Sequence, residues 1–279
     1  MTSTSTFSLN KYNLFHKHFR LSLLWDSLFF CTFGAMITKN TIKQIASLRQ
    51  QKFRKEIGLF VVEGRKMVEE LLHSDFEIVG LYASEAFLAE YPSFSKAETV
   101  SEMQMEQMSG LDTPPGILAV VKIPQQGEIK TSSRLVLALD GIANPGNMGT
   151  LIRTAEWFGI HDVVCSMDCV ELWNPKTVQA TMGSLFRMKV WKSDLADYLH
   201  QAQNKGKAIY GALLEGENLF QVGAKPEGIL VIGSESHGIR ADVLPRITHP
   251  VTIPRVDGSA TESLNAAVAG AILIAEMTK

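Results

Sequence analysis

A chain of 279 residues can form one large domain or two moderate ones with adequate hydrophobic cores. Hydrophobic residues make up 46% of it and charged residues 20%, which is typical of a soluble globular protein. The net charge of −2 excludes a protein that is basic over its whole surface, so any contact with RNA must come from a local basic patch. Three cysteines without a CxxC pair favour a reduced, cytoplasmic setting, and the seven scattered histidines predict no metal site.

Residues 1–35 differ from the rest of the chain. A basic and aromatic stretch at 11–20 precedes a mostly apolar run at 21–35, which Asp26 interrupts. No A-x-A-like cleavage site follows, and the run is too short to span a bilayer. Met36 then opens a segment that reads as an ordinary protein start. We interpret residues 1–35 as a disordered or misassigned leader, with a targeting segment as the alternative, and expect no membrane partner.

The densest positive stretch follows at residues 38–66, where eight Lys or Arg stand against two Glu. Such a run is usually a solvated helix face. Lys and Arg also supply most of the non-specific affinity for a nucleic-acid backbone. Five of these side chains are therefore candidates for RNA contact: Arg49, Lys52, Arg54, Lys55 and Arg65.

Residues 36–123 predict a small α/β domain. Its short apolar runs indicate strands at 58–64, 78–83, around 98–100 and at 117–123, with helices at 65–73, 85–91 and 102–109. The segment 124–133 is polar, contains Pro and Gly and lacks periodicity, which predicts a linker.

Strands and helices alternate in residues 134–279. We expect strands at 134–139, 162–166, 189–191, 208–213, 229–233 and 251–253, and helices at 147–158, 175–186, 195–204 and from Ser263 onward. Alternation with continuously apolar strands predicts a parallel sheet covered on both faces. Ligands of such sheets bind at the carboxyl ends of the strands.

The helix after residue 263 is almost uncharged, so it should be wedged into a core or a subunit interface. Ser259 to Glu262 reads as a capping box before this helix. Asn265 is a polar amide among apolar neighbours, and both helix capping and a functional role are open for it. The spacing predicts one buried face, formed by Leu264, Ala267, Val268, Ala271, Ile272 and Ala275.

The glycine-rich stretches exclude the common phosphate loops. Residues 141–146 have the first spacing of a Walker loop, but Asn147 stands where that loop requires a lysine. Residues 233–238 do not form G-x-G-x-x-G. Neither ATP nor a dinucleotide is therefore indicated.

Two charged residues near these loops are candidates for a site. Helical spacing places Asn147, Thr150, Arg153 and Trp157 along one side of their helix, with Leu151, Ala155 and Phe158 on the other. Arg153 could make a surface salt bridge, or its planar fork could hold an RNA phosphate. Glu235 directly follows a strand, where it could hydrogen-bond the substrate or Asn147, or cap the turn at Gly238.

Three stretches in this order, at 137–160, 229–239 and 251–277, resemble the three motifs of the SpoU (TrmH-type) branch of the SPOUT RNA methyltransferases. That resemblance implies a 2′-O-ribose methylase that uses S-adenosylmethionine, a homodimer, and an α/β fold whose C-terminal segment is threaded into a trefoil knot. Residues 54–69 resemble the N-terminal substrate-binding domain of many members, which has a ribosomal-protein-like α/β fold, so we expect residues 36–123 to form an RNA substrate-binding domain.

The resemblance also implies roles for individual residues. Arg153 would be the catalytic arginine, a poor base because of its high pKa and thus a group that positions phosphate and polarises the 2′-hydroxyl. Ser236-His237 departs from the glycine that usually follows the motif's glutamate, and Arg255 stands where the family often has Met. The remaining site residues are a polar shell of Asn147, Glu235, Ser263 and Asn265, and a cofactor lining of Gly233, Ile253 and Leu264 to which Ser263 also contributes.

The expected substrate is ribosomal RNA, with tRNA as second choice. A methylase that protects the ribosome from a drug would have the same chemistry. The alternative from another class is a non-catalytic RNA-binding or ribosome assembly factor that keeps the fold.

Overall fold

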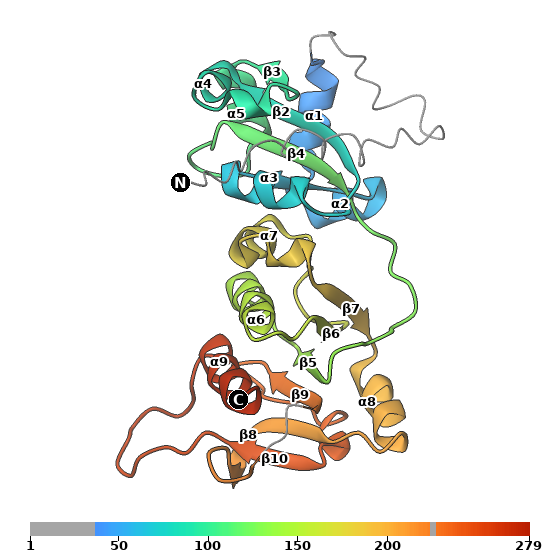
Figure 1. Cartoon of the computed structure of the whole chain (residues 1–279), viewed down its shortest axis with the longest axis vertical. Coiled ribbons are helices and arrows are strands. Elements are labelled where there is room, and N and C mark those ends of the chain that lie inside the picture. Colours follow the sequence, from blue (N-terminus) through green and yellow to red (C-terminus); the bar gives the residue numbers. More distant parts are fainter. Residues whose placement is uncertain (1–36, 224–226) are drawn as a thin grey trace, which may run out of the picture. The chain divides into compact units, whose positions relative to one another are not determined.

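The computed structural model describes residues 37–223 and 227–279, and these form two compact units that divide between Pro124 and Gln125 (Figure 1). The expected leader at 1–35 lies outside the described residues. Among the described helices, none combines the length and apolar character that crossing a membrane requires.

The first unit contains a four-stranded mixed sheet in the order β1-β4-β2-β3. β4 is antiparallel to β1 and β2, whereas β2 and β3 are parallel. The strands are β1 (Leu59–Glu63), β2 (Ile78–Ser84), β3 (Glu98–Val100) and β4 (Ile117–Lys122). The helices are α1 (Lys39–Ser47), α2 (Gln51–Ile57), α3 (Arg65–Leu72), α4 (Glu85–Glu90) and α5 (Glu102–Met108), with a 3-10 turn at Pro92–Phe94.

The second unit contains a six-stranded sheet, parallel throughout, in the order β10-β8-β9-β5-β6-β7. Its strands are β5 (Leu135–Asp140), β6 (Asp162–Ser166), β7 (Lys189–Ser193), β8 (Ile209–Asn218), β9 (Gly228–Gly233) and β10 (His249–Thr252). Its helices are α6 (Pro145–Trp157), α7 (Pro175–Thr181), α8 (Leu195–Asn204) and α9 (Ala266–Met277), with 3-10 turns at Ser184–Phe186 and Leu244–Arg246.

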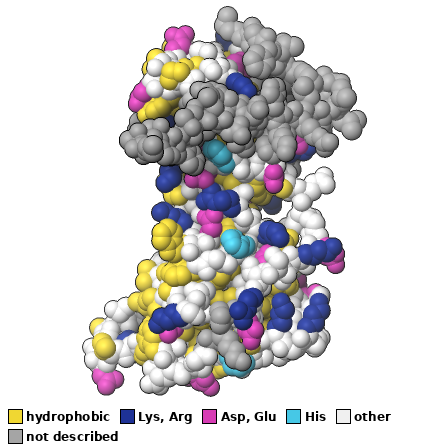
Figure 2. All heavy atoms as spheres, in the orientation of Figure 1, with side chains coloured by type: hydrophobic (Ala, Val, Ile, Leu, Met, Phe, Trp, Pro, Cys, Tyr) yellow, Lys and Arg dark blue, Asp and Glu magenta, His cyan; other side chains and the backbone are white. Residues whose placement is uncertain are grey.

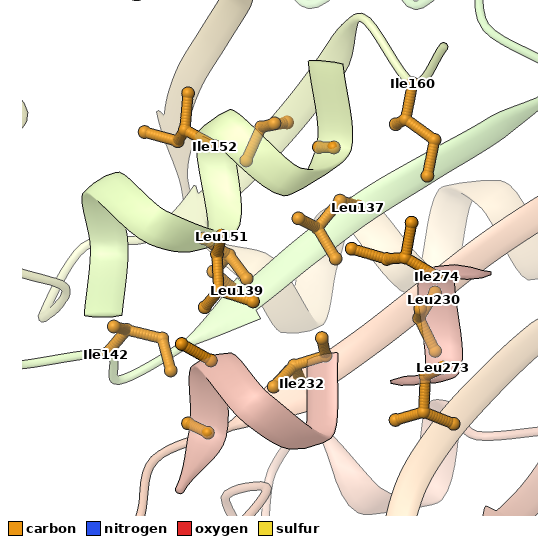
Figure 3. Packing of buried hydrophobic residues seen from close by; sticks show 14 of the residues in the cluster. Leu137, Leu139, Ile142, Leu151, Ile152, Ile160, Leu230, Ile232, Leu273 and Ile274 are labelled. Atoms are coloured by element: carbon orange, nitrogen blue, oxygen red, sulfur yellow. The ribbon is translucent and has the colours of Figure 1, made fainter. Parts of the chain in front are cut away.

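The central strand β5 is buried on both faces, as its unbroken apolar sequence predicts. Its odd-numbered side chains pack with residues of α6 and α9. Its even-numbered side chains Val136 and Ala138 pack with Leu195 and Leu199 of α8 on the opposite face. Figure 3 shows Leu137 and Leu139 facing Leu151 of α6 and Ile274 of α9.

The buried face of α9 agrees only in part with the prediction, because Ala267 is buried as expected but Leu264 and Val268 are exposed. Its buried residues are Ala266, Ala267, Gly270, Leu273, Ile274 and Met277, whereas Val268, expected inside, is 49% exposed. A helix that is apolar around its whole circumference gives no periodic signal for one side. Gly270 lies on the side that packs, where a Cβ would overlap with the end of the Leu151 side chain of α6, so the glycine lets α9 and α6 approach without moving that side chain.

Two predicted helix boundaries were wrong. α9 begins at Ala266, not near Ser263, and residues 259–262 lie in the preceding loop and form no capping box. The helix expected over 175–186 is broken after Thr181, because Met182 and Gly183 both have positive φ angles, 51° and 94°, which an α-helix cannot contain.

Candidate active site

Three loops meet at one edge of the second sheet. β5 ends at Asp140, β6 at Ser166 and β9 at Gly233, and in a parallel sheet these carboxyl ends share one edge. The loop after β5 leads into α6, and the loop after β9 carries Glu235.

Asn147 is held at the start of α6 by the local capping of that helix. Asn144 is the N-cap, and its Oδ1 accepts hydrogen bonds from the backbone N–H groups of Gly146 (2.8 Å) and Asn147 (3.1 Å). Pro145 occupies the first helical position, where no N–H is needed. The capping uses only the backbone of Asn147, which leaves its side-chain amide available for other partners.

The side chains of Asn265, Asn147 and Glu235 form a hydrogen-bonded relay. Nδ2 of Asn265 donates to Oδ1 of Asn147 over 3.1 Å, and Nδ2 of Asn147 donates to Oε1 of Glu235. The relay joins the loop before α9, the start of α6 and the loop after β9, which are the three stretches of the family resemblance. Residues 118 and 88 positions apart in the chain thus meet in one place.

Each amide in the relay can be oriented in only one way. Oδ1 of Asn265 accepts from the backbone N–H groups of Ala267 (3.0 Å) and Val268 (3.2 Å), so its Nδ2 must face Asn147. Asn147 therefore presents its oxygen to Asn265 and its nitrogen to Glu235, whose ionised carboxylate can only accept. The oxygen of Asn265 thus caps α9, which confirms the first of the two alternatives for this residue, and its nitrogen bonds Asn147.

The loop that carries Glu235 is a closed turn. Ser234 and Gly238 exchange backbone hydrogen bonds of 3.1 and 2.9 Å, and Ser234 Oγ accepts from the N–H of His237. A Cβ on Gly233 would overlap with the backbone of Gly238, so this position requires glycine. Ser236 and His237, which depart from the family pattern, are exposed.

Sequence reasoning missed an ion pair between a buried carboxylate and a partly exposed arginine beneath this turn. Asp140 is fully buried, and its two oxygens accept from the backbone N–H (2.8 Å) and the Nε (2.7 Å) of Arg240. Burial raises the pKa of Asp140, and Arg240 opposes that shift. An acidic residue ending an otherwise apolar strand was the one signal in the sequence that could have indicated it.

Arg153 lies on the exposed side of α6, about 9 Å along the helix axis from Asn147. Thr150 and Trp157 are exposed on the same helix, and Leu151 and Ala155 are buried, as the helical spacing predicts. Phe158, expected on the side of Leu151 and Ala155, is 38% exposed, because the helix ends at Trp157. Arg153 forms no hydrogen bond or ion pair with any residue that the structure describes, so the surface salt bridge considered from the sequence has no partner in this part of the chain.

Three of the four residues expected at a cofactor lie in the segment between β10 and α9, and the fourth, Gly233, ends β9. Ile253 is half-buried and packs against the cluster that includes Ala266 and Ala267. Ser263 and Leu264 are exposed in the loop, with Leu264 45% exposed. Nη1 of Arg255 donates to the carbonyl of Thr261 over 2.8 Å and closes the loop on itself. Uncovered apolar surface beside loop backbone groups fits a flat, partly polar ring such as adenine.

The candidate RNA-binding residues of the first unit differ in exposure. Lys52 and Lys55 are exposed. Arg65 is half-exposed, where it pairs with Glu69 (2.9 Å) and stacks on Tyr91. Arg49 donates to the carbonyl of Gln107 over 3.0 Å.

Arg54 corrects the expectation of a surface contact. Its side chain is 1% exposed, and Nη1 donates to the carbonyls of Leu48 (2.7 Å) and Arg49 (2.8 Å). These bonds join the end of α1 to α2, so the guanidinium is used inside the unit.

Known families match both units. The SpoU rRNA Methylase family matches residues 134–275, which is more than half of the chain. The chain belongs to this family. The MRM3-like substrate binding domain matches residues 39–119, within the first unit. The resemblance seen in the three motifs is thereby confirmed.

Relatives of this SpoU protein match it over most of its length. The 23S rRNA (guanosine(2553)-2′-O)-methyltransferase RlmP of Bacillus subtilis is 30% identical over 84% of this chain and 94% of its own. The mitochondrial rRNA methyltransferase 3 of Xenopus laevis is 26% identical over 85% of this chain and 73% of its own. A structure from Porphyromonas gingivalis, described as an RNA methyltransferase of the TrmH family, is 37% identical, with a TM-score of 0.79 over 87% of this chain and 98% of that one.

Proposed function

We propose that this protein transfers a methyl group from S-adenosylmethionine to a ribose 2′-hydroxyl of ribosomal RNA. The carrying observation is the relay of Asn265, Asn147 and Glu235, which joins the three motif loops at the ligand-binding edge of a SpoU sheet. Membership of the SpoU family supports the reaction, and the names of RlmP and rRNA methyltransferase 3 support ribosomal RNA over tRNA.

S-adenosylmethionine supplies the reaction with a methyl group on a positively charged sulfur. Gly233, Ile253, Ser263 and Leu264 would hold it, the first through its backbone and Leu264 through its uncovered side chain. Arg255 keeps the loop that bears Ser263 and Leu264 closed.

The polar residues then orient the ribose. Both ends of the Asn147 amide are already used, so Asn147 acts by fixing its neighbours and not as a proton acceptor. Glu235 is exposed, and its second carboxylate oxygen can receive a hydrogen bond from the substrate. Arg153, unpaired among the described residues, would bind the phosphate next to the target and polarise the 2′-hydroxyl. Phosphate or water would accept the proton.

The experiment is transfer of labelled methyl from S-adenosylmethionine to rRNA, with the modified ribose mapped by its resistance to alkaline cleavage. We expect Arg153→Lys to bind S-adenosylmethionine with unchanged affinity by calorimetry and to lose about 100-fold or more in turnover, because a lysine cannot reproduce the planar fork. Wild-type turnover in that variant would contradict the role of Arg153.

The same measurements separate the competing functions. A non-catalytic assembly factor would bind rRNA but transfer no methyl group with any RNA tested. Transfer to tRNA but not to rRNA would move the substrate to the second choice.

We further propose a cytoplasmic homodimer with a knotted C-terminal segment. Figure 2 shows hydrophobic side chains gathered over α6 and α9. Trp157 of α6, Val268 of α9 and Leu264 in the loop before α9 are 84%, 49% and 45% exposed. A second copy covering this face would remove that apolar surface from water. The knot is supported by the path of the chain, which leaves the sheet centre at β9, forms the edge strand β10 and returns to α6 as α9.

A further inference from the structure

Asp140 is a buried carboxylate that the proposed chemistry does not use. It is the last residue of β5, at the sheet edge where the relay lies, and Arg240 occupies both of its oxygens. An ion pair with a buried carboxylate is weak evidence for stability, because the cost of desolvating that carboxylate offsets the attraction to the arginine. Stability alone therefore does not explain the pair of Asp140 and Arg240, whereas the loops that it joins suggest a role in positioning.

Arg240 ties together the loops that follow three strands. It belongs to the loop after β9, it pairs with Asp140 at the end of β5, and its Nη1 lies 3.4 Å from Asp168 in the loop after β6. The latter two loops are joined a second time, because the N–H of Gly141 donates to Ser166 Oγ over 2.9 Å. Strands β9, β5 and β6 are neighbours in the sheet, so one guanidinium fixes the spacing of their loops.

The turn that carries Glu235 lies next to Arg240 in the chain. Ser234 and Gly238 close the turn by their backbone bonds. Ile239, the single residue between Gly238 and Arg240, is buried in the core on the α8 side of the sheet. A closed turn on a fixed base has little freedom, so the position of Arg240 sets the position of Glu235 relative to Asn147.

We propose that Asp140 and Arg240 are positioning residues for methyl transfer, which act by holding the Glu235 turn against the start of α6. Neither residue contacts the substrate; both act through Glu235 and Asn147. This inference rests on the proposed function for its kinetic consequence but not for its structural one.

The kinetic test compares Asp140→Asn with Asp162→Asn. Asp162 is a matched control, because it is equally buried in the same sheet but begins β6 at the opposite, amino edge, where it accepts from the N–H of Ser132 (2.7 Å). We expect both variants to lose thermal stability. Asp140→Asn alone should lower kcat, by about tenfold or more, with little change in KM for S-adenosylmethionine.

A double-mutant cycle with Glu235→Gln gives a readout that a merely structural role would not move. Asp140→Asn should cost about tenfold in the wild-type background and less than about twofold when Glu235 is already replaced, because the group being positioned is gone. An equal loss in both backgrounds would overturn the proposal, as would wild-type kcat in Asp140→Asn. If that variant does not fold, Arg240→Gln carries the same test, since its side chain is 34% exposed.

Amide hydrogen exchange tests the positioning without any activity. The N–H groups of His237 and Gly238 should exchange faster in Asp140→Asn but not in Asp162→Asn. Unchanged exchange would overturn the proposal even if kcat fell. Should the wild-type protein methylate no RNA, the proposed function would fail, and the exchange rates would still decide whether Asp140 holds the turn.

Discussion

At the scale of single residues, Asn265 carries out two tasks with the two ends of one amide. Its oxygen caps α9 by accepting from Ala267 and Val268, and its nitrogen donates to Asn147. Aspartate and serine could replace the cap, since both are good N-cap residues. Neither aspartate nor serine has an amide nitrogen that could donate to Asn147. Such a substitution would therefore keep the cap of α9 but lose the bond to Asn147.

This difference yields a prediction. Asn265→Ala should lose about 1 kcal/mol of stability by removing the cap. Asn265→Asp should regain that stability but not methyl transfer, because a carboxylate cannot donate to Asn147 and would repel Glu235. Thermal melts and turnover of the three proteins check this. Full activity in Asn265→Asp would show that the relay is dispensable.

Asp162 gives a prediction for pH. Burial raises its pKa, but hydrogen bonds from Ser133 and Ser132 outweigh that effect and leave the pKa lowered in the folded protein. Its ionised form therefore stabilises the fold above the unfolded pKa of about 3.9, and this stabilisation is lost as pH falls through the lower folded pKa.

We expect Asp162→Asn to lower the free energy of unfolding by about 1 kcal/mol near pH 7. In acid the difference from wild type should shrink, because the wild-type protein then loses the same contribution. Denaturant titrations at several pH values measure this. A difference that stays constant down to pH 3 would contradict it.

At the scale of elements, the sequence predicted most strands and helices because local signals agreed with the fold. β6 and α8 have the predicted bounds, and α8 is capped by Asp194, whose side chain accepts from the N–H of Asp197 over 3.0 Å. Errors arose for two different reasons. The buried face of α9 depends on tertiary packing around Gly270, whereas the break after α7 is local and depends on the positive φ angles of two successive residues.

The candidate site was predictable only as far as motifs reach. Family resemblance indicated Asn147, Glu235 and Asn265, and the position of Glu235 after its strand gave Asn147 as one possible partner, which the structure confirms. No pattern in the sequence indicated the bond between Asn265 and Asn147. Arg54 was wrongly predicted to contact RNA at the surface, because nothing in the sequence distinguishes a buried arginine from its exposed basic neighbours. The pair of Asp140 and Arg240 was missed because its members lie 100 residues apart.

The exposed face of α9 leads to a prediction about assembly. Val268→Asp should convert a dimer into a monomer, because a carboxylate in an apolar interface is desolvated without a partner. Met103→Asp, on α5 of the first unit and 68% exposed in the wild type, is the matched control. Light scattering after gel filtration measures both masses. A monomeric wild-type protein would contradict the proposed interface.

At the scale of the whole molecule, RNA affinity and methyl transfer should depend on different units. The exposed lysines lie in the first unit, and the relay lies in the second. Lys52→Glu with Lys55→Glu should weaken RNA binding and reduce its salt dependence by about one slope unit per lost phosphate contact, with S-adenosylmethionine binding unchanged.

Arg54→Ala should instead lower the stability of the unit by about 2 kcal/mol, because it leaves the carbonyls of Leu48 and Arg49 without their donor. Filter binding at several salt concentrations, with thermal melts, distinguishes the two effects.

The long sequence separations within the relay have a consequence for refolding. The two hydrogen bonds of the relay join residues that are separated by 88 and by 118 positions in the chain, so forming them closes large loops. Parallel sheets that depend on such distant contacts form slowly. Helices such as α8 are local and can appear early after dilution from denaturant. The helical circular dichroism signal should therefore recover before enzymatic turnover does. The delay between the two signals would measure how long α9 takes to pack against α6 after the helices have formed.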